Sequence, residues 1–241
     1  RANIGQQELA KVSVPLPPLP EQRAIAEALS DVDALIERLD ALIAKKRAVK
    51  TATMQRLLTG QQRLPGFDGA WETRRLGDIG DWKGGGTPSK RVEAYWQGDI
   101  PWVSPKDFKG SSISDTEDYI TQQAVQKSST ALIKEKSVLV VTRSGILRNT
   151  IPVAQNLVPV AINQDVKALN PHSSLSSAFV FYAIKHAVPE LMRSSVKTGT
   201  TVESLDFRNL LNFQVPVPSP TEQKAIATIL SDMDAEIEAL E

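Results

Sequence analysis

The chain has 241 residues, in which 28 Lys and Arg residues balance 28 Asp and Glu residues, and it contains no cysteine. This length accommodates one large or two small domains, and the absence of cysteine excludes disulfides, thiolate nucleophiles and thiolate metal ligands. A net charge of zero creates no global field that attracts nucleic acid, so any DNA contact must come from a local patch or a basic partner. No apolar run reaches the length of a membrane span, and no secretory segment is recognisable, which favours a reducing cytoplasm.

The first and last parts of the chain are copies of each other. The segment Pro15–Leu39 returns at a constant offset of 201 residues, without a gap, as Pro216–Leu240. Residues 1–20 match residues 202–221 at the same offset, and we expect them to form a closing strand and a Pro-rich linker at the end of a domain. The repeat therefore indicates a fragment, or one half of a two-fold repeated protein.

Each copy carries apolar residues at alternating spacings of four and three, which is the pattern of a coiled-coil seam. The pattern predicts a helix over Glu21–Leu58, about 57 Å long, that ends at Gly60. We expect the helices to pack on each other or on another subunit; the alternative is that each helix packs only on its own domain. The expected interface residues are Ile25, Leu29, Val32, Leu35, Ile36, Leu39, Leu42 and Ile43 in the first copy, and Ile226, Leu230, Met233 and Ile237 in the second.

The block between the two helices has mixed character and predicts an α+β domain. Its irregular alternation favours a twisted, partly antiparallel sheet with flanking helices over a parallel doubly wound one. Helices are expected over residues 176–193 and 205–211. The expected strands are residues 100–104, 137–142, 159–163, 166–169 and 213–217.

Three loops of this block combine small residues with basic ones, which suits contact with phosphates and base edges. The block as a whole, residues 71–215, holds 17 Lys and Arg residues against 14 Asp and Glu residues. Ordinary surface turns with solvated charges remain the alternative for each loop. The candidate DNA-binding residues are Lys83, Gly84, Gly85, Gly86, Thr87, Ser89, Lys90 and Arg91 in the first loop, Arg143, Ser144 and Arg148 in the second, and Lys197, Thr198 and Thr200 in the third.

No constellation for catalysis is evident in the sequence. His172 and His186 are the only histidines, and with no cysteine beside them they do not predict a zinc site. A P-loop and the signature of an adenine methyltransferase are both missing. The pair Asp165 and Lys167 resembles the end of a nuclease motif but lacks a defined acidic partner, so a surface strand edge is favoured. Trp102 and its neighbour Trp96 are expected to pack in the core.

The repeated Pro-rich and Glu-Gln segment, together with Leu57–Phe67 and Gly85–Ser89, resembles the specificity subunits of type I restriction–modification systems. The resemblance covers nearly the whole chain, and the repeated helix start is its most specific part. In that family two target-recognition domains each read one half of a split DNA sequence, and two antiparallel helices hold them apart. The missing body of a first domain and the short second helix are departures from the family pattern.

The resemblance implies a domain layout for this chain. Residues 1–20 would be the tail of a preceding recognition domain with its linker, and residues 21–60 the central spacer helix. Residues 61–220 would be a target-recognition domain, and residues 221–241 the start of a distal helix. A rigid spacer of about 57 Å would separate two readers by about 17 base pairs.

The resemblance also implies a non-enzymatic role with specific partners. The chain would bind double-stranded DNA and dock methyltransferase subunits, with restriction subunits joining through these, and it could self-associate through its helices. S-adenosylmethionine, ATP and Mg would reside on the partner subunits only, as would extrusion of the target adenine. Two alternatives stay open from the residues alone: a coiled-coil scaffold without DNA specificity, and an enzyme whose catalytic residues are not recognisable.

Overall fold

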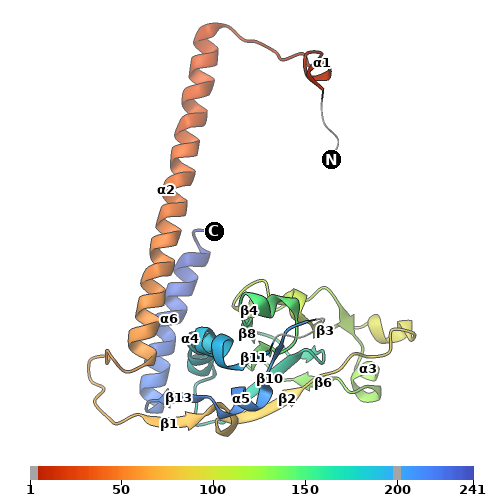
Figure 1. Cartoon of the computed structure of the whole chain (residues 1–241), viewed down its shortest axis with the longest axis vertical. Coiled ribbons are helices and arrows are strands. Elements are labelled where there is room, and N and C mark those ends of the chain that lie inside the picture. The colour runs from red at the N-terminus through yellow and green to blue at the C-terminus, as the bar shows by residue number, and fades with distance from the viewer. Residues whose placement is uncertain (1–4, 198–201) are drawn as a thin grey trace. The chain divides into compact units, whose positions relative to one another are not determined.

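The structure, a computed structural model, describes residues 5–197 and 202–241 (Figure 1). The chain divides into two compact units, of which the first is Arg1–Ala48 with Glu236–Glu241 and the second is Val49–Ala235. The division passes through the two long helices, α2 (Leu19–Leu58) and α6 (Pro220–Glu238), and not through the linkers that flank them.

The helix α2 forms where the repeat predicts a helix. It begins within two residues of Glu21 and ends at Leu58, as expected. Pro20 lies in the first turn, where its missing N–H costs no hydrogen bond. Gly60, with a φ of 71°, follows the last turn in the left-handed conformation that commonly ends helices.

The expected closing strand near the N-terminus is wrong for the part of residues 1–20 that the structure describes. A short helix, α1 (Gln6–Leu9), forms there, and the rest of the stretch up to residue 17 is irregular. In the second copy the equivalent linker residues form β13 (Gln214–Val217), which pairs with β1 (Glu72–Arg75). A strand needs a neighbour to pair its backbone groups, and no described strand pairs with the first copy.

The second unit is built on mixed sheets, which confirms the α+β prediction. The five-stranded sheet has the order β2-β10-β7-β8-β4, and the four-stranded sheet the order β5-β3-β9-β6. Each sheet contains one parallel pair, β4 with β8 and β3 with β9, while its other pairs are antiparallel. The strands of these sheets are β2 (Gly80–Gly84), β3 (Ile100–Val103), β4 (Ser112–Ile113), β5 (Tyr119–Ile120), β6 (Ala131–Ile133), β7 (Val138–Val141), β8 (Val153–Asn156), β9 (Val160–Ile162) and β10 (Val166–Pro171).

Three further α-helices and a small ribbon complete the second unit. The helices are α3 (Gln122–Lys127), α4 (Ser177–Ser195) and α5 (Phe207–Asn212), and the ribbon pairs β11 (Val196–Lys197) with β12 (Ser204–Leu205). Single turns of 3₁₀-helix lie at Leu76–Asp78, Glu93–Trp96, Pro105–Asp107 and Gly145–Arg148.

The core lies between the five-stranded sheet and the helix α4, which contacts β7, β8 and β10 (Figure 1). All four residues of β7 are buried, because this central strand has neighbours on both edges and packing on both faces. On α4, Phe179 and Ile184 are 1% and 0% exposed. The expected elements 137–142, 166–169 and 176–193 correspond to β7, β10 and α4 of this core, whereas β8, which also packs on α4, was not expected.

The last turns of α2 and the helix α6 lie side by side and antiparallel (Figure 1). Within the second unit, Lys50 pairs with Asp234, while Leu57 and Leu230 belong to one hydrophobic cluster. Within the first unit, Lys46 pairs with Glu236. As the residue number rises along α2 it falls along α6, which defines the antiparallel direction of the pairing.

Candidate nucleic-acid interface

Two of the candidate loops meet at the turn 163–165 between β9 and β10, and the described part of the third loop pairs with the second. The first loop reaches this turn through two hydrogen bonds. Gly86 donates its backbone N–H to the carbonyl of Ile162 at 3.0 Å, and the Thr87 hydroxyl donates to Oε1 of Gln164 at 2.6 Å. The glycine-rich loop is thereby fixed against the start of β10.

The second loop reaches the same turn directly after β7. The backbone N–H groups of Thr142 and Arg143 donate to the carbonyl of Asp165 at 2.7 and 3.3 Å. Nε of Arg143 also donates to Oδ1 of Asp165 at 2.7 Å. Because β7 and β10 are antiparallel neighbours, the end of one and the beginning of the other come together at this point.

The third loop is joined to the second by backbone pairing. Ser144 donates its N–H to the carbonyl of Glu203 at 3.2 Å, and Leu205 donates to the carbonyl of Thr142 at 2.8 Å. Nε of Arg148 donates to Oε1 of Glu203 at 2.6 Å. The candidate residues Thr198 and Thr200 lie outside the described residues.

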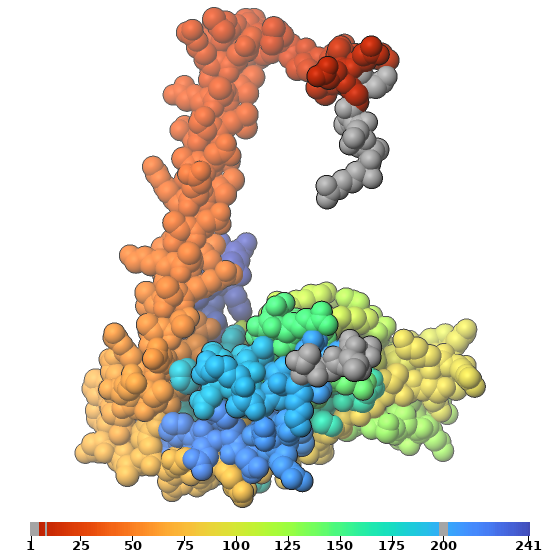
Figure 2. Space-filling view, in the orientation of Figure 1, coloured from red at the N-terminus to blue at the C-terminus, as the bar shows by residue number. Residues whose placement is uncertain are grey.

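Lys197 also belongs to this edge, at the start of the third loop. Its Nζ lies 2.6 Å from Oδ2 of Asp206, the residue that caps the N-terminus of α5. Segments that are far apart in the sequence are thus linked by these contacts. In Figure 2 the green segment around residues 143–150 is part of the exposed surface of this unit.

Packing within the protein explains why glycine is needed at two positions of the first loop. A Cβ on Gly85 would lie 1.9 Å from the carbonyl oxygen of Ile162, and one on Gly86 would lie 2.1 Å from Oγ of Ser129. Both distances are impossible contacts, so the tight packing of the loop requires glycine there. The expected close approach is thus an approach of the protein's own atoms, and contact between these glycines and DNA stays a prediction.

The basic residues on both sides of these glycines are exposed. Lys83 is exposed on β2, as is Asp81, and Arg91 is exposed in the turn before the next 3₁₀-helix. Nζ of Lys90 lies 5.9 Å from the ring centroid of Trp96, and the carbonyl of Ser89 accepts a hydrogen bond from the same indole at 3.3 Å. Their side chains are available to an anionic ligand, although contact with DNA stays a prediction.

This edge carries negative as well as positive side chains. The hydrogen bond from Arg148 holds the pKa of Glu203 below its ordinary value, and the hydrogen bond from Lys197 does the same for the pKa of Asp206. Both carboxylates are therefore charged near neutral pH and hold their cations as ion pairs. The carboxylates Asp165, Glu203 and Asp206 were not among the residues expected at this site.

The tryptophans near the first loop serve packing. Trp102 is 6% exposed and donates its indole N–H to the carbonyl of Gly86 at 3.1 Å. Trp96 meets it edge-to-face with ring centroids 5.1 Å apart. The prediction that Trp102 lies in the core is confirmed, and its indole supports the glycine-rich loop from beneath.

Other functional features are sparse in the part of the chain that the structure describes. There, no three His, Asp or Glu side chains come together closely enough to hold a metal ion. His186 is half-buried on α4, and burial lowers its pKa from the ordinary value. None of the described helices combines the length and apolar character that a bilayer crossing requires.

The candidate helix interface differs between the two copies of the repeat. In the first copy Ile25 and Leu29 are 47% and 61% exposed, while in the second Ile226 and Leu230 are 1% and 0% exposed. Ile43 and Met233 are half-buried, and Ile237 is buried. The remaining first-copy residues of the stripe are exposed, namely Val32, Leu35, Ile36, Leu39 and Leu42.

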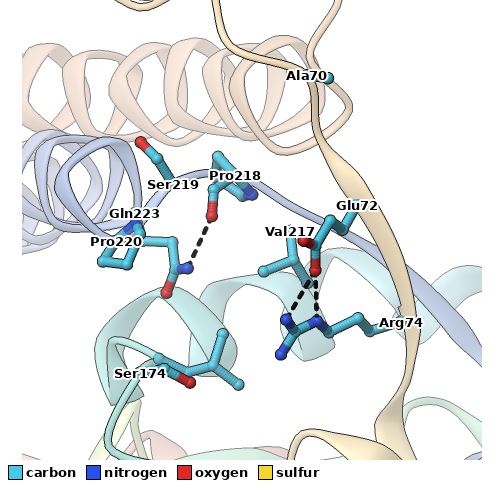
Figure 3. Close-up of a pocket in the computed structure, with 10 residues that line it drawn as sticks. Ala70, Glu72, Arg74, Ser174, Val217, Pro218, Ser219, Pro220 and Gln223 are labelled. Carbon is cyan, nitrogen blue, oxygen red and sulfur yellow. Dashed lines mark hydrogen bonds and ion pairs between the residues drawn. The ribbon is translucent and has the colours of Figure 1, made fainter.

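The start of α6 borders a cavity of about 280 Å³, shown in Figure 3. Nε2 of Gln223 donates to the carbonyl of Pro218 at 2.8 Å, and its Oε1 accepts from the N–H of Ser176 at 2.8 Å. The first copy repeats the former bond, from Gln22 to the carbonyl of Pro17 at 2.7 Å. On the cavity wall Arg74 is held by Glu72, so the cavity presents no unpaired cation to a ligand.

Comparison with known proteins identifies relatives of the whole fold. A family model described as the type I restriction modification DNA specificity domain matches residues 1–45 and 69–241. The chain is 37% identical over 233 residues to the EcoR124I/EcoR124II specificity subunit of Escherichia coli, covering 96% of this chain and 57% of that one. It is 33% identical over 171 residues to the MjaIX specificity subunit of Methanocaldococcus jannaschii, covering 70% of this chain and 39% of the relative.

Solved structures share the fold. The S subunit of a type I restriction–modification system from M. genitalium matches with a TM-score of 0.65 at 19% identity, over 99% of this chain and 60% of that one. The HsdS subunit from Thermoanaerobacter tengcongensis matches with a TM-score of 0.55 at 23% identity, over 100% of this chain and 57% of that one. The family model covers most of the sequence, and the chain therefore belongs to the type I restriction modification DNA specificity domain family.

Proposed function

We propose that this chain provides sequence-specific DNA recognition to a type I restriction–modification complex, as a subunit without catalytic activity. The second unit would read one half of a split target, and the helices would dock methyltransferase subunits. The chain spans 57% and 39% of the two relatives described above.

The observation that supports DNA reading most strongly is that the first and second loops meet at the turn 163–165, while the described part of the third loop pairs with the second. These loops come from distant parts of the sequence, and each combines small residues with basic ones. Base readout requires such an arrangement, because side chains must be held in a fixed register against base edges in a groove.

The length of α2 suits a spacer between two readers. Its 40 residues correspond to about 60 Å of helix, and therefore to about 18 base pairs of DNA. A helix of this length is stiff, whereas a flexible linker would let the distance between half-sites vary. The proposal therefore includes a target whose two halves are separated by a constant number of base pairs.

The apolar stripe of the first copy of the repeat suits a protein partner. It presents exposed aliphatic side chains from Ile25 to Leu42, a larger apolar surface than isolated exposed residues create. We assign this surface to the methyltransferase subunits or to a second helix of the same family. Restriction subunits would join through the methyltransferase, and S-adenosylmethionine, ATP and Mg would be bound by those partners.

The same stripe is the observation that favours the alternative function, a coiled-coil scaffold without DNA specificity. The two functions differ in how binding responds to salt. Contact with DNA phosphates releases counterions, so the affinity falls steeply as salt rises, whereas apolar helix packing does not weaken in this way.

The experiment measures binding of the chain, with methyltransferase subunits present, to duplex DNA between 50 and 200 mM salt. We expect affinity that falls steeply over this range, as it does for proteins that contact several phosphates. Arg143→Ala and Arg148→Ala should weaken binding, while Arg75→Ala, an exposed arginine of the same unit outside the three loops, should not. Absence of DNA binding, or binding that is indifferent to salt, would exclude the proposed function.

A further inference from the structure

Two arginines at the candidate interface are held differently from the other described paired arginines of the second unit. Arg143 and Arg148 each bind a carboxylate through Nε, at 2.7 and 2.6 Å. Among the described residues, neither guanidinium forms another hydrogen bond. Both terminal amino groups of each guanidinium are therefore left for a ligand.

Arginines elsewhere in the same unit use two nitrogens on their acid. Arg63 binds Glu222 through Nε and Nη2 at 2.7 and 2.8 Å. Arg75 binds Asp78 through the same two nitrogens at 2.7 and 3.1 Å, and Arg74 also uses both on Glu72. Among the described paired arginines of the second unit, only Arg143 and Arg148 therefore bind their acid through Nε alone.

The acid and the arginine of each pair differ in how exposed their side chains are. The side chains of Asp165 and Glu203 are 18% and 8% exposed, whereas those of Arg143 and Arg148 are 55% and 65% exposed. In each pair the acid lies beneath and the guanidinium lies outside. This arrangement fits a cation that is held for an external ligand better than a bridge that stabilises the fold.

Asp165 is fixed through its carboxylate and its backbone, and Glu203 is fixed through its backbone. Oδ2 of Asp165 accepts from the side-chain amides of Asn163 and Gln164 at 3.3 Å, and its backbone N–H donates to Oδ1 of Asn163 at 2.9 Å. Glu203 accepts the N–H of Ser144 on its carbonyl at 3.2 Å. Both acids therefore lie on backbone segments that are hydrogen-bonded to the segments carrying the arginines.

We propose that Asp165 and Glu203 are positioning residues that hold Arg143 and Arg148 by Nε, so that their terminal amino groups read guanine in the major groove. Two amino groups of one guanidinium match O6 and N7 of guanine, which is the commonest specific contact between side chains and bases. A free arginine loses rotamer entropy when it makes this contact, and prior fixation at Nε removes part of that cost. This inference rests on the proposed DNA recognition.

The proposal differs from a purely electrostatic role for the acids. If the acids only reduced the positive charge, their removal would strengthen binding to every duplex alike, because phosphate contacts carry no sequence information. If they position the arginines, their removal should strengthen non-specific binding slightly and weaken binding to the specific target. The ratio of the two affinities separates these roles.

The experiment uses the full chain assembled with methyltransferase subunits, and a target duplex selected from random DNA. Binding is compared among the target, an unrelated duplex and the target carrying 7-deazaguanine at each guanine in turn. Asp165→Asn and Glu203→Gln should each lower the ratio of specific to non-specific affinity about tenfold, the effect of losing one guanine contact. They should also abolish the penalty of 7-deazaguanine at one position.

Matched variants control for charge and for folding. Asp78→Asn removes the same charge from the exposed pair with Arg75 and should leave the ratio unchanged. Arg148→Lys keeps the charge but lacks the two amino groups, so it should lose discrimination while non-specific binding persists. Unfolding midpoints establish that each variant is folded.

An unchanged ratio in both acid variants, with sequence preference intact in the wild type, would overturn the positioning role alone. An equal rise in affinity for all duplexes would overturn it in favour of simple charge reduction. A wild-type complex without any sequence preference would instead overturn the proposed function, and the positioning role with it.

Discussion

The two copies of the repeated helix start carry similar residues in the same local structure, yet they differ in what covers them. The bond from Gln22 to Pro17 is repeated by Gln223 and Pro218, so the helix entry folds alike in both copies. Leu29 is nevertheless 61% exposed and its counterpart Leu230 is 0% exposed. The repeated sequence therefore creates an apolar helix face in both copies. Whether that face is buried depends on residues far away in the sequence that pack on it.

The contacts of the second copy show what the docking face receives. The carboxylate of Glu222 accepts from Arg63 and from the indole of Trp71, and Asp234 accepts from the hydroxyl of Tyr182. These partners lie between 52 and 159 residues away in the sequence. The corresponding Glu21 and Asp33 of the first copy are exposed.

The largest difference between the two copies in the free energy of unfolding is expected when their apolar residues are replaced. Leu230→Ala should lower the free energy of unfolding by about 2–5 kcal/mol, because it leaves a cavity in a packed core. Leu29→Ala, the same change in the first copy, should stay within about 0.5 kcal/mol because the side chain is exposed. Urea denaturation of the monomeric chain measures both values. Equal losses would mean that the first copy is buried in solution.

A smaller difference is expected for the repeated aspartate. Asp234→Ala removes an acceptor from Lys50 and from Tyr182, and Lys50 is only 7% exposed. The free energy of unfolding should fall by about 2 kcal/mol. Asp33→Ala should have no measurable effect in the isolated chain. Guanidinium denaturation of both variants checks this, and a similar loss at Asp33 would show that the first copy has a hidden partner.

The repeated glutamine should show a smaller difference still. Both copies lose a bond to a proline carbonyl when Gln is replaced by Ala, but only Gln223 also accepts from the N–H of Ser176. Gln223→Ala should therefore cost about 1 kcal/mol more than Gln22→Ala. Thermal unfolding of the two variants measures the difference. A larger effect at Gln22 would argue against the equivalence of the two copies.

The smallest effect on the isolated chain is expected in the middle of the exposed stripe. Leu35→Glu and Leu42→Glu should change the free energy of unfolding by less than about 0.5 kcal/mol, since both side chains are exposed. In contrast, they should abolish helix pairing between chains or assembly with methyltransferase subunits, which sedimentation of the mixture detects. Survival of both associations would contradict the role assigned to the stripe.

Much of the fold could be predicted from the sequence because its signals are local. The heptad stripe and Gly60 fix α2 to within two residues, and the run Val138–Val141 has the continuous apolar character of a central strand. The strand expected before α2 was wrong because a strand depends on a neighbour, and no local pattern shows whether that neighbour is there. The burial of α6 likewise depends on residues far away in the sequence.

The candidate site could be predicted in part. The basic loops stand out by composition, and the structure brings them together at one edge. Asp165 and Glu203 were missed, because an acid that supports an arginine from beneath has no signature of its own. Glu203 lies 55 residues from Arg148, and only the pairing of the second and third loops brings them together. The glycines of the first loop were singled out for contact with DNA, which stays a prediction, and packing against Ile162 and Ser129 accounts for Gly85 and Gly86.

The most direct test of the account is selection from random duplexes. The chain is mixed with methyltransferase subunits, the bound DNA is recovered, and its sequence is determined. The account predicts that the retained duplexes share base pairs at fixed positions, and that any two recognised blocks are separated by a constant distance. Retained duplexes without a common sequence would contradict it.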